Sequence, residues 1–289
     1  MIKRSNWLVA LLCAGSAASA QPSFTADQLV AKNLEARGGQ AALDAIKTVQ
    51  FEGRALEPGD FELKFKQVQK RQPQGDAVRM DLTVQGLTLV QAYDGSNGWK
   101  INPFAGRRDA ERMAADEARS MGDQALLSGV LLGAAASKGR VNYAGTEDFD
   151  GTQAYKLKVV QADGDEYVYL LDPDTFLEIK TVESRRIRGA LQVTDYEMGD
   201  YEKVAGVYFP MSIDSWTDGQ PNQRQRIVIE TATANVDAPA SLFAQPADGA
   251  KPAAAAPGDV PIPTPAGSND KKADEPATPP AATPSKGIK

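Results

Sequence analysis

The residue types of this chain exclude much of the common catalytic chemistry. The sequence holds no histidine among its 289 residues, so Ser-His and Cys-His catalysis is absent, as are the usual histidine ligands of zinc and copper. Gly95, Gly98 and Gly106 do not form a phosphate loop, because no Gly-Lys-Ser/Thr motif accompanies them. Whatever chemistry this protein performs, imidazole is not involved.

Acidic residues gather in two turns. The segment Glu147–Gly151 resembles part of a calcium loop, but it lacks the third acidic position and the distant glutamate. Asp172 and Asp174 flank a proline, where aspartate is favoured because it bonds the local backbone. A glycosidase-like pair would need carboxylates facing across a cleft, which the sequence alone does not place. We expect no metal, no cofactor and no enzyme, and a carboxylate-based hydrolase is the weakest alternative.

Aromatic and basic residues leave two interpretations open. Trp99 and Phe104 could form a platform for a sugar, or could be core residues. Lys70 and Arg71 end an amphipathic strand just before a turn at Pro73, where basic side chains are usually solvated. Arg71 could instead reach across the mouth of a curled sheet and donate to carbonyls at a helix end, which lack partners within the helix.

The two ends of the chain differ in composition from the middle. Residues 1–20 combine Lys3 and Arg4, an apolar run and a small-residue site at 18–20, which predicts a cleavable secretory signal. Cys13, the only cysteine, leaves a lipid anchor as the alternative; after cleavage at Ala20 no cysteine would remain. Residues 244–289 are rich in alanine and proline and are predicted to be disordered. The net charge of −6 argues against nucleic acid as a partner.

The middle of the chain predicts a mainly β domain, residues 21–243, with a few helices. Residues 25–37 form a helix that starts with a Thr25-x-x-Gln28 capping box, and a short helix follows at 40–47. Alternation at Phe61, Leu63 and Phe65 begins a meander that runs to Phe104. After a helical segment, further strands are expected at 141–149, 153–161, 165–172, 176–184, 191–201, 207–215 and 225–236. We predict one large, curved antiparallel sheet of about 11 strands.

Residues 80–106 are apolar on both faces of their strands, so this part of the sheet is either covered on both sides or holds an apolar ligand on one. The predicted helices at 109–121 and 123–132 suit a lid, because the second is apolar yet contains Gly129. The alternative is a helix packed permanently on the sheet. The predicted cavity residues are Leu82, Val84, Leu87, Leu89, Trp99, Ile101 and Phe104. The predicted lid residues are Leu126, Leu127, Val130 and Leu131.

Two segments carry a resemblance to a known family. Residues 93–104, YDGSNGWKINPF, and residues 170–179, LLDPDTFLEI, resemble segments of the LolA-like outer-membrane lipoprotein-sorting proteins. The resemblance implies a half-open β-barrel whose apolar concave face takes up acyl chains beneath a helical lid. It also implies an arginine, in a Lys-Arg-Pro-like turn, that latches the lid. Lys70-Arg71-Gln72-Pro73 matches that turn apart from Gln72, so Arg71 is the candidate latch.

The function implied by this resemblance is that of a periplasmic carrier in a Gram-negative bacterium. It would bind lipoprotein acyl chains or other lipids and deliver them towards the outer membrane, as a monomer that meets an inner-membrane donor and an outer-membrane acceptor. The alternative is a binding module of the same fold that senses lipid or lipoprotein. The proline-rich tail lies outside the familiar pattern and leaves the cargo open.

Overall fold

The computed structural model of the chain describes residues 24–59, 61–136, 139–217 and 220–247. Contacts divide the chain into two units, Met1–Ala255 and Ala256–Lys289. The second unit, the expected signal at 1–20 and most of the expected tail lie outside the described residues. The structure below is therefore that of the first unit.

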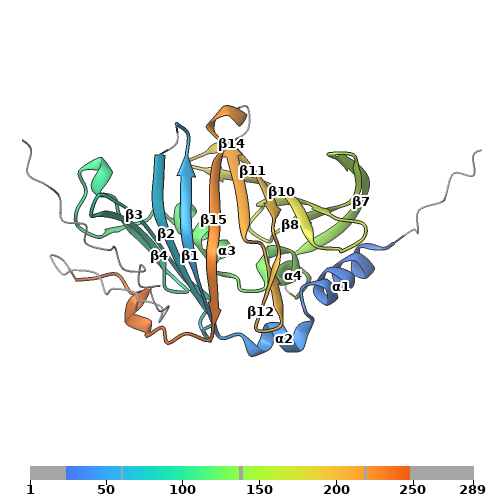
Figure 1. Ribbon diagram of the computed structural model, residues 1–289, viewed down its shortest axis with the longest axis horizontal. Coiled ribbons are helices and arrows are strands. Elements are labelled where there is room, and N and C mark those ends of the chain that lie inside the picture. Colours follow the sequence, from blue (N-terminus) through green and yellow to red (C-terminus); the bar gives the residue numbers. More distant parts are fainter. Residues whose placement is uncertain (1–23, 60, 137–138, 218–219, 248–289) are drawn as a thin grey trace, which may run out of the picture. The chain divides into compact units, whose positions relative to one another are not determined.

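One antiparallel sheet of 13 strands dominates the described residues (Figure 1). In this sheet β15 (Gln225–Ala234) lies between β1 (Thr48–Glu57) and β14 (Ser212–Thr217). The last strand of the sheet in sequence therefore pairs with both halves, and links the meander that starts at β1 to the one that ends at β14. The remaining strands are β2 (Phe61–Lys70), β3 (Ala77–Val84), β4 (Leu87–Tyr93), β5 (Gly98–Ile101), β6 (Glu111–Arg112), β7 (Arg140–Phe149), β8 (Thr152–Val160), β9 (Glu166–Leu171), β10 (Glu178–Ile187) and β11 (Ala190–Gly199). The edge strands β6 and β7 do not pair with each other, so the sheet is not closed. The predicted fold class, an open curved sheet with a few helices, is confirmed.

The predicted strand at 207–215 is two strands in the structure. β13 (Val207–Phe209) pairs with β12 (Glu202–Val204) in a separate small sheet, and β14 starts afresh at Ser212. Pro210 separates them, because proline has no N–H to contribute to a β-ladder.

The two faces of the main sheet differ in chemistry, as the alternation along β2 predicts. Leu63 and Phe65 are buried on the face that we call the inner face. On the opposite, outer face, Lys66 pairs with Glu52 and Arg54 pairs with Glu62. Charged pairs thus cover the outer face at β1 and β2, while apolar residues cover the inner face there.

Four α-helices in the described residues pack at the inner face or at its edge. α1 (Ala26–Ala36) begins with the predicted capping box, in which Thr25 and Gln28 bond each other's backbone. α2 (Gln40–Ala45) follows after Gly38 and Gly39. A side chain at Gly38 would overlap the Gly206 carbonyl, with its Cβ 2.1 Å from that oxygen, so only glycine permits this approach. None of these helices has the length and apolar character needed to cross a membrane.

The two remaining helices differ from their predicted boundaries. α3 (Ala115–Ala125) starts after Ala114, not at Asp109, because β6 intervenes and extends the sheet beyond β5. α3 also continues through Asp123, where a new helix was predicted to begin. α4 (Gly129–Ala136) starts at Gly129, whose φ of 77° is left-handed and incompatible with a helix interior. The predicted interior glycine is therefore the start of a helix.

The inner face holds two apolar clusters of its own. One surrounds Phe51, Phe65 and Phe209, and the rings of Phe51 and Phe209 meet edge to face at 5.4 Å. The other joins Leu29 of α1 and Leu131 of α4 to strands β8 and β9. The curved sheet is therefore partly filled by the protein's own side chains.

The segment after β15 packs on the outer face. It includes a 3-10 helix, Ala240–Leu242, and ends in Phe243, which is fully buried with Val68 and Ala77. Trp99 donates from Nε1 to the Phe243 carbonyl at 2.7 Å. Two further 3-10 turns, Pro103–Ala105 and Pro221–Gln223, lie between strands.

Candidate functional site

A hollow of about 420 Å³ lies between the inner face and helices α3 and α4. This volume is within the range of small-ligand pockets, roughly 300–1,000 Å³. We call it the lidded hollow. Its lining is Arg37, Gln67, Met80, Asp123, Gln124, Gly129, Val130, Leu131, Tyr167, Tyr169, Glu178, Thr181, Glu183, Tyr196, Met198, Tyr201, Pro210, Ile213 and Ile227.

The apolar floor of the lidded hollow follows from strand register. Met198 of β11 is paired with Ile213 of β14, and Ile213 is paired with Ile227 of β15. Paired residues of antiparallel strands point to the same face, so three apolar side chains stand in a row. Val130 and Leu131 of α4 line the hollow as well. The hollow therefore offers hydrocarbon contact from both sides.

Tyrosines and a buried ion pair form the rest of the floor. Arg37 contacts Glu178 at 3.4 Å, with both side chains less than a tenth exposed. Tyr201 donates to the Glu178 carbonyl at 2.8 Å. Burial raises the pKa of Tyr201 and Tyr169 well above its ordinary value, so both phenols stay neutral. Arg37, Glu178 and the Tyr201 hydroxyl have partners within the protein, which leaves the apolar row as the place for an uncharged chain.

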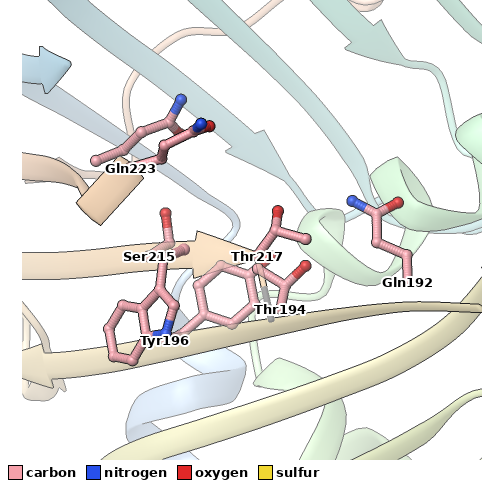
Figure 2. Close-up of a pocket in the computed structure, with 8 residues that line it drawn as sticks. Gln192, Thr194, Tyr196, Ser215, Thr217 and Gln223 are labelled. Carbon is pink, nitrogen blue, oxygen red and sulfur yellow. The ribbon is translucent and has the colours of Figure 1, made fainter. Parts of the chain in front are cut away.

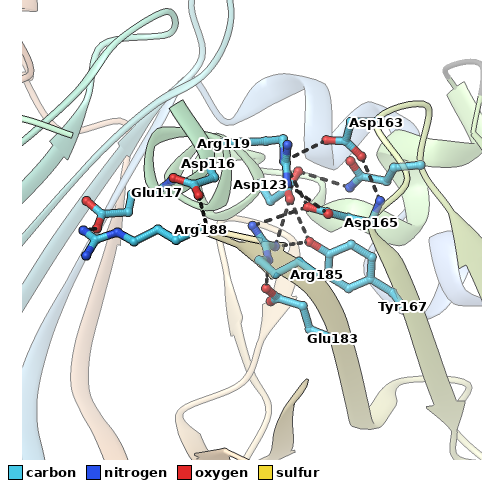
Figure 3. Close-up of polar contacts among 11 residues, drawn as sticks. Asp116, Glu117, Arg119, Asp123, Asp163, Asp165, Tyr167, Glu183, Arg185 and Arg188 are labelled. Carbon is cyan, nitrogen blue, oxygen red and sulfur yellow. Dashed lines mark hydrogen bonds and ion pairs between the residues drawn. The ribbon is translucent and has the colours of Figure 1, made fainter. Parts of the chain in front are cut away.

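Arg185 of β10 fastens α3 to the sheet (Figure 3). Its Nη2 lies 3.1 Å from Oδ2 of Asp123 on α3, and it also donates to the Tyr167 hydroxyl. Tyr167 in turn donates to Asp123 at 2.7 Å. Nη1 lies 3.7 Å from Asp165, and Nε pairs with Glu183. We call these five residues the Arg185 cluster.

More contacts extend along α3 from the Arg185 cluster. Arg119 lies 3.2 Å from both Asp163 and Asp165, in the turn before β9. At the start of the helix, Asp116 accepts from the backbone N–H of Arg188 at 2.6 Å, and Glu117 accepts from the Arg188 side chain at 2.6 Å (Figure 3). α3 is thus held over the hollow by polar groups rather than by apolar packing alone.

Burial also changes the acidity of three members of the Arg185 cluster. It raises the pKa of the Asp165 and Glu183 carboxyls, and the nearby Arg185 guanidinium offsets this only in part. Burial likewise raises the pKa of Tyr167, so its hydroxyl remains a donor. Protonation of Asp165 and Glu183 is therefore easier in this site than in water.

The seven predicted cavity residues divide between the two faces of the sheet. Leu82 is paired with Leu89, and Val84 with Leu87, on the inner face. Trp99 and Ile101 are paired with Ala92 and Val90 on the outer face, where Trp99 is 1% exposed. Phe104 lies in a 3-10 turn and is about half exposed. None of the seven lines the lidded hollow, so a single cavity built from all of them is inconsistent with the register.

The inner-face residues among them lie beside the hollow rather than in it. Leu82 and Val84 pack against the cluster around Phe51 and Phe65. Leu87 is 40% exposed at a hairpin tip. Of the predicted lid residues, Val130 and Leu131 line the hollow, Leu127 packs in the main cluster, and Leu126 is half-buried.

Arg71 has a different contact from the predicted one. Its Nη2 lies 3.4 Å from the Leu43 carbonyl in α2, and no hydrogen bond joins it to α3 or α4 in the part of the chain described. The position follows from topology, because the Arg71 N–H also bonds the carbonyl of Lys47, directly after α2. Arg71 therefore donates to a carbonyl near the end of a helix, as predicted, but that helix is α2 and not one of the two predicted lid helices.

The acidic turns behave as local structure. Asp172 accepts from the backbone N–H groups of Asp174 and Thr175 at 3.1 and 2.7 Å. Glu147 and Asp148 pair with Lys156 and Gln153 across the β7–β8 hairpin. Each of these carboxylates is engaged within its own turn or hairpin.

Sequence reasoning missed the Arg185 cluster and the tyrosines. Glu183 and Arg185 are two residues apart in a strand, which places both on one face, here the inner one. Tyr167 and Tyr169 share the same spacing on β9. A strand covered by a helix is expected to be apolar on its covered face. Two charged residues on that face are therefore a signal that could have located the contact with α3.

Comparisons with known proteins place this geometry in a class of fold: an unclosed antiparallel sheet with helices over its hollow side. No protein-family model and no curated protein matches the sequence. Among solved structures, a candidate outer membrane lipoprotein-sorting protein domain from Vibrio parahaemolyticus superposes with a TM-score of 0.51 at 11% identity, covering 74% of this chain and 95% of its own. A DUF1329 family protein from Desulfovibrio piger gives 0.54 at 12% identity, covering 76% and 97%.

A LolA superfamily protein from Nitrosomonas europaea gives a TM-score of 0.50 at 13% identity, covering 77% of this chain and 98% of its own. At such identities the likeness concerns the fold. The chain thus has a LolA-type fold, as the resemblance in sequence predicts.

Proposed function

We propose that this protein is a periplasmic carrier that binds acyl chains of lipoproteins or lipids in the lidded hollow and delivers them towards the outer membrane. The observation that carries the proposal is a hollow of about 420 Å³ with an apolar row on its floor and apolar α4 residues above it. The LolA-type fold supports the same function. The expected signal sequence supports export.

The energetics of the hollow fit a carrier that must also release its cargo. Burial of an acyl chain contributes about 0.8 kcal/mol for each CH₂ group. The opposing term is the polar fastening of α3, because opening the lid separates Asp123 from Arg185 and Tyr167. A cargo is then exchanged by opening one helical segment while the sheet stays folded. We propose transfer by a monomer between an inner-membrane donor and an outer-membrane acceptor, without catalysis.

Gentle purification from the periplasm followed by mass spectrometry tests the proposal. We expect co-purified lipid or acylated peptide from the natural protein. We expect much less from Ile213→Trp, which fills the floor of the hollow with a larger ring. Val228→Trp is the matched control. Val228 and its neighbour Ile229 point to opposite faces of β15, and Val228 lies on the outer face, away from the hollow.

Absence of bound lipid from the natural protein, with the fold intact, would contradict the proposal. Equal loading of the two tryptophan variants would remove the lidded hollow as the binding site. Circular dichroism of both variants checks that each remains folded.

A further inference from the structure

A second hollow of about 270 Å³ opens beside the lidded hollow (Figure 2). Its lining is Gln192, Thr194, Tyr196, Ser215, Trp216, Thr217, Gln223 and Gln225. We call it the amide-hydroxyl hollow. Tyr196 lines both hollows, so they meet at its side chain.

Strand register makes the two hollows one surface with a change of polarity. On the inner face of β11, Met198 belongs to the lidded hollow, Tyr196 to both, and Thr194 to the amide-hydroxyl hollow. β14 repeats the change, because Ile213 pairs with Met198 while Ser215 pairs with Tyr196 and Thr217 with Thr194. A ligand lying along these strands would therefore meet hydrocarbon at one end and polar groups at the other.

The polar end carries groups that are free to bind. In the part of the chain that the structure describes, the side chains of Gln192, Thr194, Ser215 and Thr217 make no hydrogen bond to another protein group. Amides and hydroxyls both donate and accept, and paired strands hold them about 5 Å apart. Hydroxyl groups on a sugar ring or a polyol also donate and accept, so several of them can bond such a row of side chains at once.

The charge of this hollow narrows the class of head group. None of its eight lining residues is charged. The charged neighbours on β10, Glu183 beside Thr194 and Arg185 beside Gln192, are paired with each other. An anionic head would call for free arginine or lysine, and a cationic head for a carboxylate or an aromatic cage. A neutral head needs neither.

From this arrangement we infer that the natural cargo is an amphiphile with a neutral, hydroxyl-rich head group. Its acyl chain lies in the lidded hollow and its head in the amide-hydroxyl hollow, with Tyr196 at the junction. This inference rests on the proposed function, since it requires an acyl chain in the lidded hollow, and it adds the chemistry of the head.

The test uses probes that share one tail and differ in the head: dodecyl maltoside, dodecylphosphocholine and dodecanoate, each below its micelle concentration. Calorimetry of the full chain should give at least about tenfold tighter binding of the maltoside than of the zwitterionic phosphocholine or the anionic dodecanoate. Thr194→Val with Ser215→Ala should weaken maltoside binding by about two- to tenfold for each hydrogen bond lost. Binding of the other two probes should be unchanged.

The matched control is Thr231→Val, because Thr231 is exposed on β15 and lines neither hollow. Gln192→Leu gives an independent variant if the double change impairs folding. Equal affinity for the three probes, or equal weakening of all three in the variants, would overturn the head-group inference and leave the proposed carrier standing. Failure of every probe to bind would overturn both.

Discussion

Arg185 reaches from β10 towards the helix that covers the lidded hollow and meets carboxylates on both sides. Asp123 comes from α3, Asp165 from the turn before β9, and Glu183 from β10 itself. The side chain is 3% exposed, so these charges depend on one another rather than on water. Removing one member of such a buried group leaves the others uncompensated.

Arg185→Leu should therefore release α3 and lower the free energy of unfolding by about 3–5 kcal/mol. We expect faster amide hydrogen exchange in α3 and faster release of a bound lipid. Arg71→Leu is the matched control, because its guanidinium bonds α2. If Arg71→Leu accelerates exchange in α3 as much as Arg185→Leu does, Arg185 would not be the specific attachment of α3. The prediction from the sequence, in which Arg71 holds the helical segment, would then be supported.

Glu183 gives the site a dependence on pH. Burial raises the pKa of its carboxyl in the folded protein, so the folded state holds the proton more tightly than the unfolded state. The resulting stabilisation is fully present below the unfolded pKa of about 4.3 and is lost as pH rises through the raised folded value. The glutamine of Glu183→Gln cannot ionise. The free energy of unfolding of this variant should therefore increase, relative to that of the natural protein, as pH rises. Denaturant unfolding at several pH values measures this; a difference that does not change with pH would contradict it.

At the scale of elements, one glycine sets where α4 starts and a second lowers its helical stability. Gly129 starts the helix with a left-handed φ of 77°. Gly133 lies in the helix interior, and a Cβ there would meet Leu126 Cδ1 at 3.4 Å, an ordinary contact. Glycine inside a helix costs about 1 kcal/mol relative to alanine. α4 is thus less stable than a helix of the same length without an interior glycine.

These two glycines should respond to alanine with opposite signs. Gly129→Ala places a side chain in a left-handed conformation and should destabilise α4 by about 1–2 kcal/mol. Gly133→Ala should stabilise it by up to about 1 kcal/mol and slow lipid release. Hydrogen exchange within α4 measures both. A stabilising Gly129→Ala would mean that α4 does not begin where the structure places it.

At the scale of the whole molecule, the segment after β15 covers the outer face. Phe243 and Leu242 bury Val68 and Ala77, and the Phe243 carbonyl accepts from Trp99. A chain cut after residue 247 should keep its unfolding midpoint. A chain cut after residue 236 exposes this cluster and leaves the Trp99 N–H unpaired, so it should lose several kcal/mol of stability. Equal midpoints for the two truncations would show that the segment is dispensable.

Much of the fold could be read from local pattern. The capping box at Thr25, the alternation along Phe61–Phe65 and the turn residues fixed most element types, because periodicity and capping depend on neighbours in sequence. The helix at 109–121 was placed wrongly because the pairing of β6 with β5, a longer-range contact, overrides local preference. The contacts of Arg185 with Asp123 and Tyr167 span 62 and 18 residues, so only its spacing with Glu183 on one strand could be read locally.

By itself, then, the sequence determined that the chain is a mostly β protein with a large curved antiparallel sheet and a helical segment within it; that the sheet is open was implied by the resemblance to a family. Only the tertiary structure decided which strand faces share a hollow. It set Trp99 against Phe243 on the outer face and brought Met198, Ile213 and Ile227 together on the inner one. The physical reason is that a strand alternates every residue, so the side a residue faces depends on register with partners far away in the chain.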